Sequence, residues 1–90
     1  MLSPDLVVEV LSESNTRAEM ELKRHDYFAP GTKLIWQIDP LGRTAAVYRP
    51  GAPNDPQMIE SAGVLDGEDV LRGFQLPLAQ VFAKLDRPPS

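Results

Sequence analysis

The fold is decided by residues 4–16, PDLVVEVLSESNT. Within this stretch the run from Leu6 to Leu11 is apolar and largely β-branched, which predicts a β-strand. Because polar side chains do not alternate with apolar ones along the run, we expect a strand that is buried on both faces. Glu9 is the charge that interrupts the run, and a charge in the middle of a buried strand requires an explanation.

A helix is predicted directly after this strand. Residues 12–16 are rich in helix-capping residues, and Thr16 with Glu19 matches the Thr-x-x-Glu capping box. We expect the helix to run from Thr16 to about Ala29, because Pro30-Gly31 follows and ends helices. Its apolar residues do not form one stripe, which predicts contacts on two sides. One side carries Met20, Tyr27 and Phe28, and the nearly opposite side carries Ala18, Leu22 and Ala29.

The rest of the chain predicts a small sheet and a closing helix. Turn residues between apolar runs predict a β-hairpin, a proline-rich loop, further short strands and a short amphipathic helix. The order of elements predicts a mixed α/β (α+β) fold in which a helix packs on a small mixed sheet. We expect a single domain over residues 1–86 and a frayed tail at 87–90. The expected ranges are strands at 33–39 and 44–49, a loop at 50–56, strands at 58–61 and within 65–74, and a helix at 78–85.

Composition excludes several classes of protein. The 90 residues are 42% hydrophobic and 24% charged, as in a folded globular protein. The chain has no cysteine and one histidine, His25, which excludes a disulfide framework, a thiolate zinc site and a histidine cluster. No apolar run approaches the ~20 residues of a membrane span, so we expect a cytoplasmic protein without membrane partners. The net charge of −4 argues against a free-standing nucleic-acid binder, which normally has a basic surface.

The predicted first strand is difficult to bury within so short a chain. A domain of this size buries only about two thirds of the surface that its unfolded chain exposes. A strand covered on both faces needs neighbours on each side, and one long helix cannot supply all of that cover. We therefore expect either a homodimer or a fold whose N-terminal part is missing from the chain.

Glu9 has two interpretations. An isolated carboxylate in an apolar interior is costly unless it is paired, protonated or bound to a metal. In the first interpretation, Glu9 lies at an open edge or pairs with a basic residue of the next element. In the second, it binds a hard cation such as Mg²⁺, which prefers carboxylate oxygens and water.

Lys23 also has two interpretations. On the predicted helix, Glu19, Lys23 and Tyr27 occupy positions i, i+4 and i+8 and so lie on one line. This is the pattern of an ordinary Glu–Lys helix pair, worth only ~0.3–0.5 kcal/mol. Alternatively, the helix folds back beside the strand and the Lys23 ammonium reaches Glu9, which would lower the cost of a buried carboxylate.

Three segments, in this order, resemble a known family. They are PDLVVEVLSESNTRAEMELKRHDYFAPGTKLIWQIDP at 4–40, TAAVYRPG at 44–51 and LDGEDVLRGFQLPLAQVF at 65–82. The chain resembles the C-terminal half of the Uma-two family, which is related to restriction endonucleases of the PD-(D/E)XK superfamily. This resemblance covers nearly the whole chain, and it implies a restriction-endonuclease-like core with a magnesium site that hydrolyses phosphodiester bonds of DNA.

The resemblance also implies roles for particular residues. Glu9 matches the family's second acidic position, a catalytic metal ligand. Lys23 with Tyr27 matches a Lys-x-x-x-Tyr pattern that supplies the catalytic lysine, with Glu19 and Tyr27 near the site. The family's first metal-binding aspartate lies in a strand upstream of this sequence. Asp5 is a weak substitute, because four residues along a strand separate it from Glu9 by roughly 13 Å.

Two departures from the family pattern bear on activity. The first is the missing aspartate, and the second is Ser12-Glu13-Ser14 in place of the usual Ser-Pro-Ser, which adds a negative charge near the expected pocket. Two functions therefore remain open. One is a Mg²⁺-dependent DNA endonuclease domain that is incomplete or inactive as this chain. The other is a catalytically dead remnant that acts as a self-associating structural or interaction module.

Overall fold

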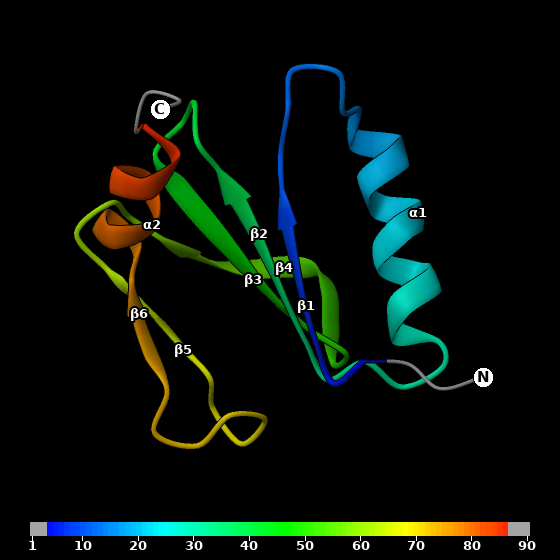
Figure 1. Ribbon diagram of the computed structural model, residues 1–90. Helices are drawn as coiled ribbons and strands as arrows, with labels where there is room; N and C mark the ends of the chain where they lie inside the picture. Colours follow the sequence, from blue (N-terminus) through cyan, green and yellow to red (C-terminus); the bar gives the residue numbers. More distant parts are fainter. Residues whose placement is uncertain (1–3, 87–90) are drawn as a thin grey trace.

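The computed structural model describes residues 4–86, which form the elements drawn in Figure 1. The predicted first strand, long helix, hairpin and closing helix are confirmed, the closing helix with the predicted bounds. The tail predicted at 87–90 lies outside the described residues. In chain order the elements are β1 (Leu6–Val10), α1 (Arg17–Phe28), β2 (Leu34–Asp39), β3 (Thr44–Arg49), β4 (Ala52–Ile59), β5 (Val64–Asp66), β6 (Gln75–Pro77) and α2 (Leu78–Leu85).

The main sheet lies between two layers. Its strand order is β1-β2-β3-β4, with β1 parallel to β2 and the other neighbours antiparallel. The parallel pair is joined through α1, because parallel neighbours require a crossover connection. Helix α1 covers one face, and α2 with the β5–β6 ribbon lies over the other (Figure 1). The mixed α+β fold is therefore confirmed.

An apolar core lies on each side of the sheet. Successive side chains of a strand point to opposite faces, so β2 and β3 contribute to both cores. On the α1 side, the buried residues of the sheet pack against Tyr27 and Phe28 of the helix. These contacts fix how α1 lies across the sheet. The α1-side core consists of Val7, Ile35, Ala46 and Tyr48, and the α2-side core of Leu34, Trp36, Ile38, Ala45, Val47, Leu65, Leu78 and Phe82.

Helix α1 begins as the sequence predicts. Thr16 has extended backbone angles and its hydroxyl accepts a hydrogen bond from the Glu19 amide at 3.1 Å. The Glu19 carboxylate does not close the reciprocal half of the capping box, and instead accepts a hydrogen bond from the Asn15 side-chain amide at 2.9 Å. Of the two apolar sides, the one with Met20 faces the sheet, whereas Leu22 on the other is 62% exposed. The predicted second contact of the helix is thus not made by the described residues.

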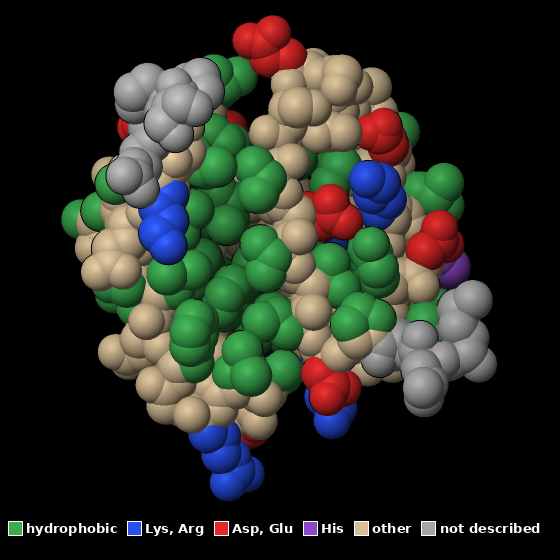
Figure 2. Space-filling view, viewed as in Figure 1, with side chains coloured by type: hydrophobic (Ala, Val, Ile, Leu, Met, Phe, Trp, Pro, Cys, Tyr) green, Lys and Arg blue, Asp and Glu red, His purple; other side chains and the backbone are tan. Residues whose placement is uncertain are grey.

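The prediction that β1 is buried on both faces was wrong, because the face that carries Val8 and Val10 is open. Val8 and Val10 are each 49% exposed, and β2 is the neighbour of β1 among the described residues. An apolar run without alternation indicates apolar surroundings, but here the layer of α2 and the ribbon does not cover these two valines. Apolar side chains consequently gather on the surface between that layer and β1 (Figure 2).

Strand β4 runs through the segment predicted to be a loop. Pro53 and Pro56 lack amide hydrogens, which argued against a strand at 50–56. However, β4 is the edge strand opposite β1, and its register with β3 shifts at a bulge between Val47 and Arg49. The prolines fall in the part of β4 that has no register partner, so their missing hydrogens cost no sheet hydrogen bond.

The predicted strands near the C-terminus are confirmed in part. Residues 58–59 belong to β4. Of the range 65–74, residues 65–66 belong to β5, and the remainder is the turn that joins β5 to its antiparallel partner β6. The ribbon's turn begins at Gly67, whose amide bonds the Phe74 carbonyl at 2.9 Å. The turn residues of this range predicted a break in the strand, but not the pairing between the two short strands on either side of it.

Replacing Gly67 with alanine should destabilise the domain. A Cβ at Gly67 would lie 2.7 Å from Leu71 Cβ and close to the Leu71 backbone, so the turn would have to shift. Overpacking of this kind costs about 1–3 kcal/mol. Gly51→Ala is the matched control, because nothing lies within 4 Å of its added Cβ. Urea unfolding should show a clear loss for the first variant and a change within about 0.5 kcal/mol for the second; equal midpoints would contradict the described turn.

Candidate functional site

Glu9 lies on the face of β1 that α1 covers, two residues from the buried Val7. Its side chain is 22% exposed, because β1 is at the edge of the sheet. The carboxylate is therefore neither in a sealed interior nor fully in solvent. Both interpretations of Glu9 therefore remain open. The residue lies at the open edge of the sheet, and its carboxylate has the access to solvent that a metal ligand needs.

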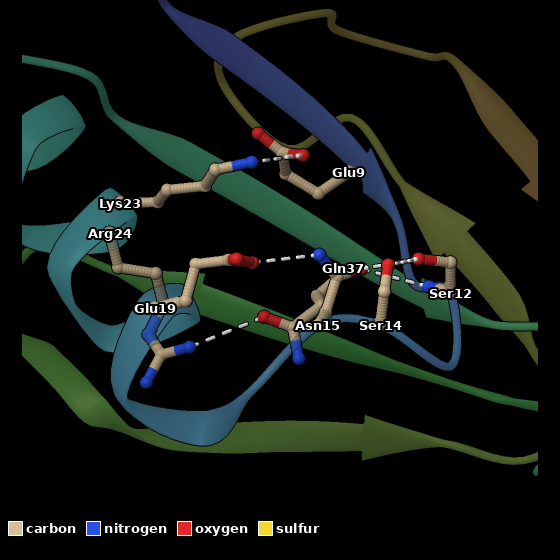
Figure 3. A network of polar contacts seen from close by, with 8 residues as sticks. All are labelled: Glu9, Ser12, Ser14, Asn15, Glu19, Lys23, Arg24 and Gln37. Carbon is tan, nitrogen blue, oxygen red and sulfur yellow. Dashed lines mark hydrogen bonds and ion pairs between the residues drawn. The ribbon is translucent and has the colours of Figure 1, made fainter.

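The structure brings Lys23 to Glu9. Helix α1 crosses the sheet so that Lys23 Nζ lies 4.0 Å from Glu9 Oε2 (Figure 3). The lysine side chain is 47% exposed, so the pair is a loose one and contributes little to stability, about 0–1 kcal/mol. The alternative helix pair between Glu19 and Lys23 is not among the ion pairs of residues 4–86, since Glu19 bonds Asn15. The strand and the helix thus converge as in the second of the two interpretations of Lys23.

Two further residues extend this contact into a polar cluster of Glu9, Lys23, Arg24 and Gln37. Gln37 is the register partner of Glu9 on β2, so both side chains point to the α1 face. Arg24 follows Lys23 along α1 and its Nη1 donates to Gln37 Oε1 at 3.2 Å (Figure 3). The sequence reasoning missed both residues. A signal existed for Arg24, because it stands four residues after the buried Met20 and so on the sheet-facing side of the helix.

The other predicted site residues lie around this cluster or away from it. Glu19 is exposed at the start of α1, and Tyr27 is half-buried in the α1-side core. Asp5 is exposed just before β1, where its carbonyl accepts hydrogen bonds from the amides of Lys33 and Leu34. No contact between the carboxylates of Asp5 and Glu9 is present among the described residues. The structure therefore joins Glu9 and Lys23 but does not bring Asp5 to them.

The donor set fits Mg²⁺ only in part. Mg²⁺ is commonly held by one or two carboxylates together with waters and substrate phosphates. Glu9 offers such a carboxylate, but residues 4–86 contain no group of three His, Cys, Asp or Glu side chains that could hold a metal ion. Within the polar cluster, Glu9 is thus the residue that could bind Mg²⁺. Water, substrate or an acid from another segment or chain would have to supply the rest.

The fold has a solved counterpart. It matches a crystal structure described as a putative nuclease belonging to DUF820 from Anabaena variabilis, with a TM-score of 0.80 and 23% sequence identity. The match covers 94% of this chain and 47% of that one, so the chain spans about half the length of this neighbour. At this identity the likeness shows a shared fold, which here is a mixed α+β fold with a mixed sheet and two helices.

Sequence comparison gives the family. The profile of the Uma2 family, described as "Putative restriction endonuclease", matches residues 1–79, and the chain belongs to this family. The resemblance found in the sequence is therefore confirmed. No curated protein matches the chain. Within residues 4–86, no helix is both long enough and apolar enough to cross a membrane.

Proposed function

We propose that this chain contributes a Mg²⁺-dependent site for the hydrolysis of DNA phosphodiester bonds. In this proposal Glu9 binds the metal and Lys23 stabilises negative charge on the phosphate. The observation that carries it is the 4.0 Å separation of Lys23 Nζ and Glu9 Oε2, which places an anionic ligand and a cation at one spot. Membership of the Uma2 family supports the choice of a nuclease reaction.

The two side chains suit these roles for different reasons. Glu9 is held on a strand, so the backbone that carries its carboxylate is fixed in place. Mg²⁺ bound there would supply an activated water and neutralise phosphate charge. Lys23 is on a rigid helix but its side chain is half-exposed, so the ammonium can move from the carboxylate to a phosphate oxygen when substrate enters. A positive charge is most effective where negative charge develops during the reaction.

The proposed site needs a second acid. Asp5 is the candidate within the chain, but its exposed position before β1 makes an acid from another segment or another copy the better choice. A homodimer could bring such an acid to the open edge of β1. We place the reaction in the cytoplasm, as expected for a protein that acts on DNA.

A second candidate function follows from the exposed valines. Among the described residues β1 pairs with β2 on one side, so its other backbone edge is unpaired and lies beside the exposed Val8 and Val10. Such edges pair with other strands. A chain without activity could therefore serve as a self-associating module. Light scattering checks this candidate, which requires a dimer in wild type and a monomer in Val8→Lys, because a charge on the edge opposes strand pairing. A monomeric wild type would eliminate it.

Nicking of supercoiled plasmid DNA tests the main proposal. With the second acid supplied by another copy, the chain should convert supercoiled to relaxed plasmid in Mg²⁺ or Mn²⁺, and EDTA should stop the conversion. Equal residual rates for wild type, Glu9→Gln and Lys23→Ala would remove the catalytic proposal and leave the self-associating module.

Lys23→Ala should lower the nicking rate by about ten- to a hundredfold, since a preorganised charge that meets the transition state typically has an effect of this size or larger. Lys23→Arg keeps the charge and should retain more activity than the alanine variant. The melting temperature should change little in either variant, because the ion pair with Glu9 is loose and half-exposed. A rate that is unaffected by Lys23→Ala would show that the lysine plays no part in the reaction.

A further inference from the structure

Arg24 is a buried cation whose partners are neutral. Its side chain is 8% exposed, although arginine is almost never fully buried unless it is paired. Nε donates to the Pro53 carbonyl and Nη1 to Gln37 Oε1, both at 3.2 Å. The guanidinium carbon lies 4.1 Å from the centroid of the Tyr48 ring. Arg24 is therefore fixed in place by groups that leave its charge unbalanced.

No acid forms an ion pair with this guanidinium within the described part of the chain. None of the ion pairs among residues 4–86 includes Arg24. A guanidinium carries five N–H donors, and the two hydrogen bonds above use two of them. An anion with several acceptor oxygens is the partner that such a group binds best.

Arg24 lines a cavity of about 520 Å³ between the N-terminal half of α1 and strands β2 to β4. This volume is within the range of small-molecule pockets, about 300–1,000 Å³. Ser12, Asn15 and Asn54 line it with neutral hydrogen-bonding groups, and Arg17 adds a second positive charge. Glu21 is the one acid among its lining residues, so the lining is positive overall. The cavity therefore suits an anion better than a cation.

The cavity adjoins the proposed cleavage site. Gln37, which holds Arg24, is the register partner of Glu9, and Arg24 follows Lys23 along α1. Figure 3 shows Lys23 directed to Glu9 and Arg24 directed to Gln37 from the same part of the helix. A nucleic-acid strand with one phosphate at Arg24 would thus pass close to Glu9 and Lys23.

We propose that this cavity binds a phosphodiester of a DNA strand, with Arg24 as its charged anchor and Arg17 as a second contact. The planar guanidinium can donate two parallel hydrogen bonds to phosphate oxygens, and Tyr48 and Gln37 hold it in one orientation. The proposal rests on the proposed function for the choice of DNA as the source of the phosphate. It requires no hydrolysis, so binding measured in EDTA separates its failure from failure of the nuclease proposal.

The first test is binding of a fluorescent 12-base-pair duplex in EDTA, measured by anisotropy at several salt concentrations. Arg24→Met should weaken binding about tenfold at low salt and reduce the salt slope by about one, as expected for the loss of one phosphate contact. Arg17→Gln should weaken binding less, because this side chain is exposed. Arg72→Met is the matched control, with the same change of charge on an exposed side chain outside the cavity, and should change affinity less than twofold.

A second measurement covers the case in which Arg24→Met does not fold. The Arg24 Nε–H signal of the wild-type chain is followed by NMR during titration with the duplex and, separately, with inorganic phosphate. The duplex should shift this signal, and saturating inorganic phosphate should compete with the duplex. A shift with inorganic phosphate but not with duplex would overturn DNA as the source. The proposed site would be overturned if neither probe shifted the signal. It would also be overturned if Arg72→Met and Arg17→Gln lowered the affinity for the duplex equally.

Discussion

Trp36→Ala is expected to remove most of the stability of the domain. Trp36 is 2% exposed at the centre of the α2-side core, and its ring stacks on Phe74 with centroids 6.3 Å apart. Replacing a buried tryptophan with alanine costs about 3–5 kcal/mol. A chain of this length has a total free energy of unfolding of roughly 5–14 kcal/mol, so the loss is a large part of the whole.

Urea unfolding followed by far-UV circular dichroism measures this effect. The variant should unfold at a much lower urea concentration or show no cooperative transition at all. Leu41→Ala is the control, because Leu41 is 74% exposed in the β2–β3 turn and should change stability by less than about 0.5 kcal/mol. A midpoint for Trp36→Ala near that of wild type would mean that α2 and the ribbon do not pack on the sheet as described.

Glu9→Gln is expected to lower Mg²⁺-dependent nicking by about a hundredfold or more. The substitution keeps the size of the side chain but removes the charge that would hold the metal in the proposed site, and a bound metal supplies several kcal/mol of transition-state stabilisation. Each 1.36 kcal/mol corresponds to a factor of ten in rate. The measurement is the initial rate of plasmid relaxation over a range of Mg²⁺ concentrations.

The control for Glu9→Gln is Glu60→Gln, which makes the same change of charge on an exposed residue that follows β4. This variant should retain the wild-type rate and Mg²⁺ dependence. The melting temperature of Glu9→Gln should stay close to wild type, because the carboxylate pairs loosely with Lys23. Wild-type nicking by Glu9→Gln would leave Glu9 with the simpler role of an edge-strand ion pair.

Much of the fold could be predicted from local signals. Thr16 and Glu19 indicated the start of α1, Pro30-Gly31 its end, and the β-branched run the position of β1. These signals are strong because caps and breakers act within a few residues of the chain. The strand at 52–59 could not be predicted, since proline is tolerated there only because the register with β3 shifts, which is a tertiary feature.

The polar cluster could be predicted only in part. Glu9 and Lys23 were found because a carboxylate in an apolar strand needs a partner and because both match the family pattern. Arg24 was missed, because its burial depends on Tyr48 and Pro53, which come from distant strands. The exposure of Val8 and Val10 was also unpredictable, because the same run of apolar residues is found in strands whose faces are covered and in strands with an open face.

The most direct test of a metal site at Glu9 is paramagnetic broadening by Mn²⁺ in the NMR spectrum of the chain. Mn²⁺ at a small fraction of the protein concentration should selectively broaden the amide signals of Val8, Glu9 and Gln37, and excess Mg²⁺ should restore them. The same titration of Glu9→Gln should leave these signals sharp. Broadening centred elsewhere, or equal broadening in Glu9→Gln, would contradict the claim that Glu9 is a metal ligand beside Lys23.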